Sequence, residues 1–168
     1  MKKIAAALLF MMMAVTAGAG ELTIYGDFPD PVKPGGPPKN WNLTSGARGS
    51  LEFVSTEDGN AVMLSADEKK RFGIYSRPAA VKAGDKIKVT AMVRGEKIEF
   101  SLFQYGKKFS NPSLRKVLKS TIEGKMLEAV FTVTDSPKGK TDSIRVCFTV
   151  ENGASASLIN VKAFLLEE

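Results

Sequence analysis

The clearest pattern along the chain is an alternation of apolar positions with mainly polar ones. From residue 86 to residue 94, every second residue is apolar; these positions are Ile87, Val89, Ala91 and Val93. A period of two predicts a strand with one buried face. Residues 97–105 repeat the pattern, so Phe103 and Tyr105 are expected to face away from the core.

Short runs of the same kind recur along most of the chain, and turn residues separate them. They are residues 22–25, 51–55, 60–65, 72–77, 126–134, 143–151 and 157–166. Asp58-Gly59 and Asn152-Gly153 are strong hairpin signals between neighbouring runs. About nine short strands with little helix predict an all-β protein, a β-sandwich of two sheets.

One segment gives a mixed signal. Between residues 111 and 120, Leu114, Val117 and Leu118 stand at helical spacing, and Asn111-Pro112-Ser113 is a sequence that can begin a helical turn. The preferred interpretation is a basic loop followed by a short strand over residues 116–122.

A proline-rich segment over residues 29–40 holds five of the eight prolines. It cannot be a helix or a central strand, so we expect a loop. The loop leads into Trp41, which we expect to close one end of the sandwich because large aromatic residues are usually buried.

The first nineteen residues have the pattern of a bacterial secretory signal peptide. Lys2 and Lys3 precede an apolar run over residues 4–15, and Ala17-Gly18-Ala19 supplies the small residues of a cleavage site. We therefore predict a signal peptide over residues 1–19 and a single β-sandwich domain over residues 20–168. The alternative is an uncleaved membrane anchor. Cleavage would give an exported protein, periplasmic, extracellular or on the cell surface, without stable membrane insertion.

Composition excludes several kinds of chemistry. The chain has no histidine and one cysteine, which removes the usual zinc and copper sites and the Ser-His-Asp and Cys-His catalytic groups. Cys147 lies in an apolar run and is expected to be buried. Without Lys2 and Lys3 the formal net charge falls from +6 to +4, and the lysines are scattered, so no nucleic-acid partner is expected. The glutamates stand in no recognisable catalytic context, so we predict a protein that is not an enzyme.

Six motifs follow one another in a familiar order. They are Gly26-Asp27-Phe28, Pro37-Pro38-Lys39-Asn40-Trp41, residues 59–64, Tyr75-Ser76-Arg77-Pro78, residues 81–95 and residues 158–162. Together they resemble the CenC-type carbohydrate-binding modules, which are jelly rolls of the galactose-binding-like fold. The resemblance spans residues 22–166 and implies a sandwich of jelly-roll type that binds sugar.

The resemblance also implies where a metal would bind. Members of that family commonly hold a structural calcium ion between the opening motif and the closing strand. Here Pro29 and Asn160 stand where members usually carry acids. Asp27 and Asn160 could still supply oxygen ligands, so the expectation is at most a weak structural calcium site and no required cofactor.

Sugar recognition needs aromatic faces and fixed polar groups. Strand parity gives most of the candidates, and Phe109 is added because it lies in a lysine-rich loop with no obvious core partner. The predicted ligand-binding residues are Tyr75, Arg77, Phe103, Tyr105 and Phe109. Arg94 and Arg145 are expected on the same outward surface as Tyr75 and Arg77. The sequence thus predicts an exported, non-catalytic domain whose partner is a carbohydrate or polysaccharide. The alternative is a structural or protein-interaction β-sandwich of the cell surface or periplasm without a sugar site.

Overall fold

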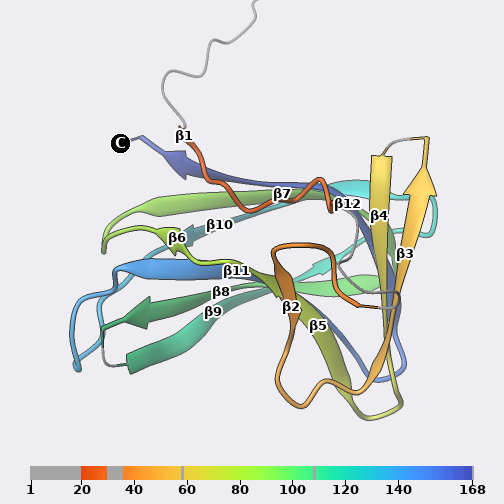
Figure 1. Ribbon diagram of the computed structural model, residues 1–168, viewed down its shortest axis with the longest axis horizontal. Coiled ribbons are helices and arrows are strands. Elements are labelled where there is room, and N and C mark those ends of the chain that lie inside the picture. The colour runs from red at the N-terminus through yellow and green to blue at the C-terminus, as the bar shows by residue number, and fades with distance from the viewer. Residues whose placement is uncertain (1–19, 30–35, 58, 108, 168) are drawn as a thin grey trace, which may run out of the picture.

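Two antiparallel sheets stack face to face in the computed structural model, which describes residues 20–29, 36–57, 59–107 and 109–167 (Figure 1). The predicted signal peptide and residues 30–35 of the proline-rich segment lie outside the described residues. Within the described part of the chain, no helix is long and apolar enough to cross a membrane.

The first sheet has the strand order β10-β7-β12-β4-β3, with β1 paired to β12. Its strands are β1 (Gly20–Glu21), β3 (Gly49–Thr56), β4 (Gly59–Ala66), β7 (Lys86–Gly95), β10 (Lys125–Thr132) and β12 (Ser155–Leu166). The pairing in β12 shifts between Ile159 and Lys162, where Asn160 has a φ of 49°. This irregularity lies beside the segment that follows β1.

The second sheet has the order β2-β5-β11-β8-β9, with β6 paired to β11. Its strands are β2 (Trp41–Leu43), β5 (Arg71–Ser76), β6 (Ala79–Ala80), β8 (Lys97–Gly106), β9 (Phe109–Lys119) and β11 (Ser143–Glu151). Asn152 and Gly153, with φ of 58° and 77°, connect β11 to β12 across the two sheets. Two consecutive positive φ values are what an Asn-Gly pair readily adopts, which explains the turn signal in the sequence.

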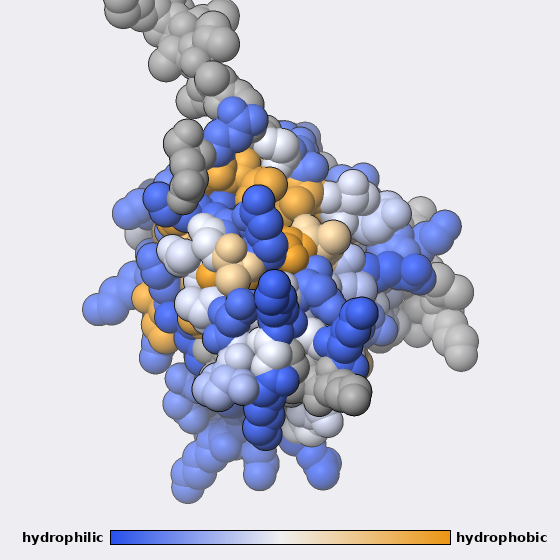
Figure 2. Space-filling view, turned by 90° about the vertical axis from the view of Figure 1, so that its left-hand side faces the viewer, coloured by the Kyte–Doolittle hydropathy of each residue, from blue (hydrophilic) through white to orange (hydrophobic). Residues whose placement is uncertain are grey.

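The core lies between the sheets and follows the predicted alternation. The four alternating apolar residues of β7, from Ile87 to Val93, are fully buried, and so are Ile98, Phe100 and Leu102 of β8. Because each strand buries every second residue, both sheets keep an outer face. The two-sheet sandwich expected from the sequence is thus confirmed. Figure 2 shows one end of the molecule as mostly hydrophilic, with its hydrophobic residues gathered in the upper part of the view.

Trp41 closes the core as predicted. It is 3% exposed, and its ring lies 5.3 Å from that of Phe28 and 6.0 Å from that of Phe148. The indole Nε1 donates a hydrogen bond to the Tyr25 carbonyl oxygen at 2.8 Å. The expected strand over residues 22–25 is wrong: only Gly20–Glu21 pairs with β12 there. After a bond from the Leu22 N–H to the Ala163 carbonyl, Tyr25 and Phe28 adopt positive φ angles and turn Phe28 into the core.

The ambiguous segment also differs from its expectation. The preferred loop and short strand are replaced by β9, a strand of 11 residues that pairs with β8 along most of its length. Pairing with a long neighbour outweighs the helical spacing of three apolar residues, because strand formation depends on cross-strand packing.

Cys147 is fully buried, as its apolar surroundings in the sequence predict. Burial is the main cause that raises the pKa of its thiol from 9.0 to about 11. The sulfur lies 3.7 Å from the Thr149 hydroxyl. The thiol therefore stays protonated at neutral pH, and a protonated thiol is a poor nucleophile.

We expect Cys147 to be almost unreactive toward a thiol reagent such as Ellman's reagent in the native protein. At pH 8 its higher pKa lowers the thiolate fraction roughly 100-fold, and burial blocks access as well. The measurement compares reaction rates without and with denaturant, the unfolded chain serving as the control. A native thiol that reacts as fast as the unfolded one would contradict the buried position.

Candidate functional site

A hollow of about 520 Å³ lies on the outer face of the second sheet. The hollow is lined by Thr44, Ser45, Gly46, Arg71, Tyr75, Glu99, Phe103, Tyr105, Arg115 and Thr149. These residues come from β5, β8, β9 and β11 and from the segment after β2.

Cross-strand register explains why the face is hollow. Tyr75, Cys147, Ser101 and Arg115 are successive partners across β5, β11, β8 and β9. Gly73, Thr149, Glu99 and Val117 form the neighbouring row. Small side chains therefore occupy the middle of the sheet, while arginine and aromatic side chains stand around them.

Three aromatic residues gather at one side of the hollow. The rings of Tyr75 and Phe103 lie 6.4 Å apart and are tilted by 51°. The guanidinium carbon of Arg145 lies 5.0 Å from the Tyr75 ring centre and 5.4 Å from that of Tyr105. All four side chains are half-buried. Burial raises the pKa of Tyr105, and the nearby Arg145 cation partly offsets this rise.

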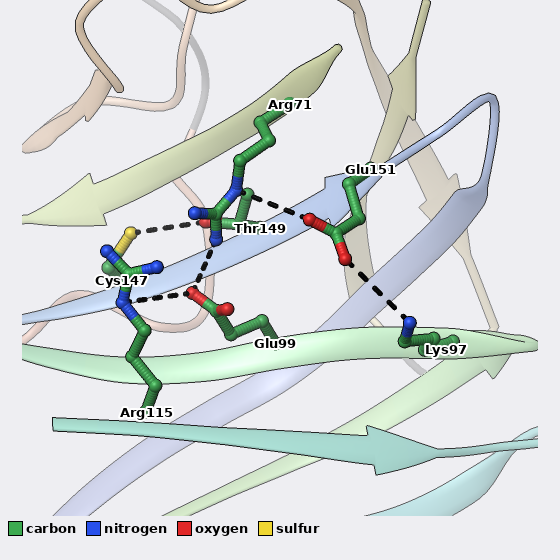
Figure 3. Close-up of polar contacts among 7 residues, drawn as sticks. All are labelled: Arg71, Lys97, Glu99, Arg115, Cys147, Thr149 and Glu151. Carbon is green, nitrogen blue, oxygen red and sulfur yellow. Dashed lines mark hydrogen bonds and ion pairs between the residues drawn. The ribbon is translucent and has the colours of Figure 1, made fainter. Parts of the chain in front are cut away.

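Charged side chains surround the other side of the hollow (Figure 3). Glu99, 15% exposed, accepts a hydrogen bond from Arg71 Nη2 at 2.7 Å and lies 3.9 Å from Arg115 Nε. Arg71 Nε lies 3.6 Å from a Glu151 oxygen, and the other Glu151 oxygen lies 3.8 Å from Lys97 Nζ. A network of several charges holds its members in place better than an isolated surface pair does.

The structure brings together three of the five residues predicted for ligand binding, namely Tyr75, Phe103 and Tyr105. Arg77 is exposed just after β5 and does not line the hollow. The expectation that Arg94 shares this surface is wrong, because β7 belongs to the first sheet. Phe109 begins β9 opposite Gly106, and its side chain lies outside the described residues.

Sequence reasoning missed the polar residues of the hollow, chiefly Arg71, Glu99 and Arg115. Parity alone puts Glu99 on the same face of β8 as Phe103, so the outward position of Glu99 could have been predicted from the sequence. Arg115 was hidden in the ambiguous segment. The position of Arg71 beside Glu99 depends on strand order, which the alternation does not contain.

The residues predicted for calcium, Asp27 and Asn160, do line one groove together. The groove also contains Glu21 and Lys162, and Lys162 brings a positive charge. Among the described residues, no three acidic or other metal-ligating side chains lie close enough to hold a metal ion. Because calcium needs several oxygen ligands, usually including carboxylates, this donor set fits calcium poorly, and the weak site stays a prediction.

Comparison with solved structures identifies the type of β-sandwich. No known sequence family and no curated protein matches the chain. Among solved structures, the family 11 carbohydrate-binding module of a cellulosomal cellulase of Clostridium thermocellum is 18% identical. The match has a TM-score of 0.57 and covers 90% of this chain and 97% of the module. The chain has the jelly-roll fold of a carbohydrate-binding module. The predicted jelly-roll sandwich is thus confirmed, while the narrower CenC-type resemblance stays a prediction.

Other matches widen the range of functions found on this fold. A family 11 module from Clostridium thermocellum in complex with a β-1,3-1,4-mixed-linked tetrasaccharide is 17% identical, with a TM-score of 0.54, and covers 90% of this chain and 100% of that one. A cyclase from Fischerella sp. TAU is 12% identical, with a TM-score of 0.65. The match covers 88% of this chain and 97% of the cyclase chain. The enzymatically active domain of bacteriophage CBA120 tailspike protein 4 matches 76% of this chain with a TM-score of 0.60 and 12% identity. The chain spans only 19% of the tailspike chain.

Proposed function

We propose that the protein is a non-catalytic carbohydrate-binding domain that holds a glycan in the hollow of the second sheet. The observation that carries the proposal is the cluster of Tyr75, Phe103 and Tyr105 beside fixed polar groups on the outer face of this sheet. Aromatic rings cover the C–H faces of sugar rings, and fixed polar groups bind hydroxyls. The fold shared with a module that carries a tetrasaccharide supports the proposal.

The tilt of the rings bears on the shape of the ligand. Because Tyr75 and Phe103 are inclined by 51°, they form a corner and not one flat platform. A corner of this kind contacts a single sugar unit on two sides, whereas a flat strip of rings suits an extended chain. We therefore propose recognition of one or two sugar units within a glycan.

Affinity electrophoresis in gels containing mixed-linkage β-glucan, α-glucan, xylan or acidic polysaccharides tests this function. At least one polysaccharide should retard the wild-type protein, and Tyr75→Ala should weaken that binding roughly 5-fold, because a well-placed aromatic contact contributes about 1 kcal/mol. Tyr25→Ala is the matched control, since Tyr25 is 42% exposed but lies outside the hollow.

Two results would contradict the proposal. One is the absence of retardation by any polysaccharide, which would favour the alternative of a structural or protein-interaction domain. The other is retardation that Tyr75→Ala leaves unchanged, which would move the sugar site elsewhere on the molecule.

A further inference from the structure

Arg145 differs from the other arginines of the second sheet's outer face. Arg71 lies close to Glu99 and Glu151, and Arg115 lies close to Glu99. Within the described part of the chain, no carboxylate lies within ion-pair distance of Arg145, whose contacts are the rings of Tyr75 and Tyr105. In the sheet, Arg145 stands directly opposite Phe103.

Contact with two rings has a chemical consequence. A guanidinium that lies over an aromatic ring interacts through its charge and its flat face, and the N–H groups at its edge keep their capacity to donate. These donors form a planar fork that matches the two oxygens of a carboxylate. Holding the fork between side chains also reduces the entropy that is lost when a ligand binds.

The charge around the hollow points the same way. Among the described residues that line it, Arg71 and Arg115 are cations and Glu99 is the only acid. Arg145 adjoins the lining through the two tyrosines, and Glu151 lies between Arg71 and Lys97. With Lys97 and Glu151 included, these described side chains are four cations against two anions, which is a local excess of positive charge. A neutral sugar would leave this excess uncompensated, whereas an anionic sugar would balance part of it.

We infer that the hollow selects an acidic glycan, and that Arg145 binds the carboxylate of a uronic acid residue whose ring packs against Tyr75 and Phe103. The inference rests on the proposed function and adds the ligand class. The corner formed by the two rings holds one sugar unit, and Arg145, opposite Phe103, places the carboxylate of that unit beside the corner.

The test compares pairs of polymers that differ in one group, which is a carboxylate in one and a hydroxymethyl group in the other. Polygalacturonate, alginate and glucuronoxylan are each compared with the same polymer after chemical reduction of its carboxyl groups, by affinity electrophoresis at fixed ionic strength. The wild-type protein should bind at least one carboxylated polymer at least about 10-fold more tightly than its reduced form, since a hydrogen-bonded ion pair is lost on reduction. Polyacrylate, which has carboxylates but no sugar, should not bind comparably.

Three variants connect that preference to Arg145. Arg145→Gln should remove the preference and reduce binding of the carboxylated polymer to the level of its reduced form. Arg145→Lys, which keeps the charge but loses the planar fork, should retain only part of it. Arg77→Gln removes the same charge from an exposed position outside the hollow and should behave as wild type. Unchanged thermal unfolding of each variant checks that the fold is intact.

The outcomes separate this inference from the proposed function. Equal binding of carboxylated and reduced polymers, or a preference that Arg145→Gln leaves intact, would overturn the selection of acidic glycans while sugar binding stands. Comparable binding of polyacrylate would overturn it too, because the protein would then be adsorbing any polyanion. If the protein bound none of the polymers, reduced forms included, the proposed function and the inference would both be overturned.

Discussion

Replacing Trp41 with alanine is expected to lower the free energy of unfolding by about 3–5 kcal/mol, the usual cost of removing a large buried aromatic side chain. The side chain is 3% exposed and packs between Phe28 and Phe148. Its removal also takes the indole donor from the Tyr25 carbonyl oxygen, 2.8 Å away. Loss of both effects weakens the attachment of the N-terminal segment to the core.

The measurement is urea unfolding followed by circular dichroism, because Trp41 is the only tryptophan and the variant loses that fluorescence signal. Leu43→Ala is the control in the same strand: Leu43 is 41% exposed, and its removal should change stability by less than about 0.5 kcal/mol. A Trp41→Ala variant as stable as Leu43→Ala would show that the indole does not close the core.

Gly26→Ala is expected to destabilise the fold by about 3 kcal/mol, the upper end of the usual cost of overpacking, because a new methyl group in a packed site forces the backbone to move. A Cβ atom on Gly26 would lie 1.8 Å from the Val161 carbonyl oxygen and 2.8 Å from the Val161 Cβ. The Gly26 carbonyl also accepts a hydrogen bond from the Val161 N–H at 2.9 Å. Backbone movement that relieved the clash would break this bond.

Gly20→Ala is the matched control for Gly26→Ala, since a Cβ at Gly20 has nothing within 4 Å. Unfolding curves of the two variants should differ clearly in their urea midpoints. If Gly26→Ala keeps the wild-type midpoint, the close approach of the two backbones plays no part in stability.

The contacts behind the Trp41 and Gly26 predictions also explain the opening motif, which the sequence offered only as a resemblance. Gly26 is needed for close approach to β12, and Phe28 fills the core against Trp41. Neither role can be inferred from residues 26–28 alone, because the partners lie far away in the sequence. By contrast, the alternation in β7 and β8 directly predicts their buried faces, since parity is a local property.

The candidate site also combines residues that local parity predicts with residues whose positions depend on strand order. Parity placed Phe103 and Tyr105 outward on β8, and both line the hollow. Parity alone could not decide which sheet each strand joins, and the grouping of Arg94 with Tyr75 failed for that reason. The ion pairs of Glu99 depend on β5, β8 and β9 lying in one sheet, an order set by long-range packing.

The position of β12 in the first sheet has a consequence for how the chain folds. This last strand lies between β7 and β4 and also pairs with β1, so the sheet stays in separate parts until Ser155–Leu166 are available. The pairing of β12 with β1, which lies far away in the sequence, contributes to a high contact order, typical of β-sandwiches that fold in milliseconds to seconds. A growing polypeptide therefore cannot complete this domain until Ser155–Leu166 have been synthesised and have left the ribosome.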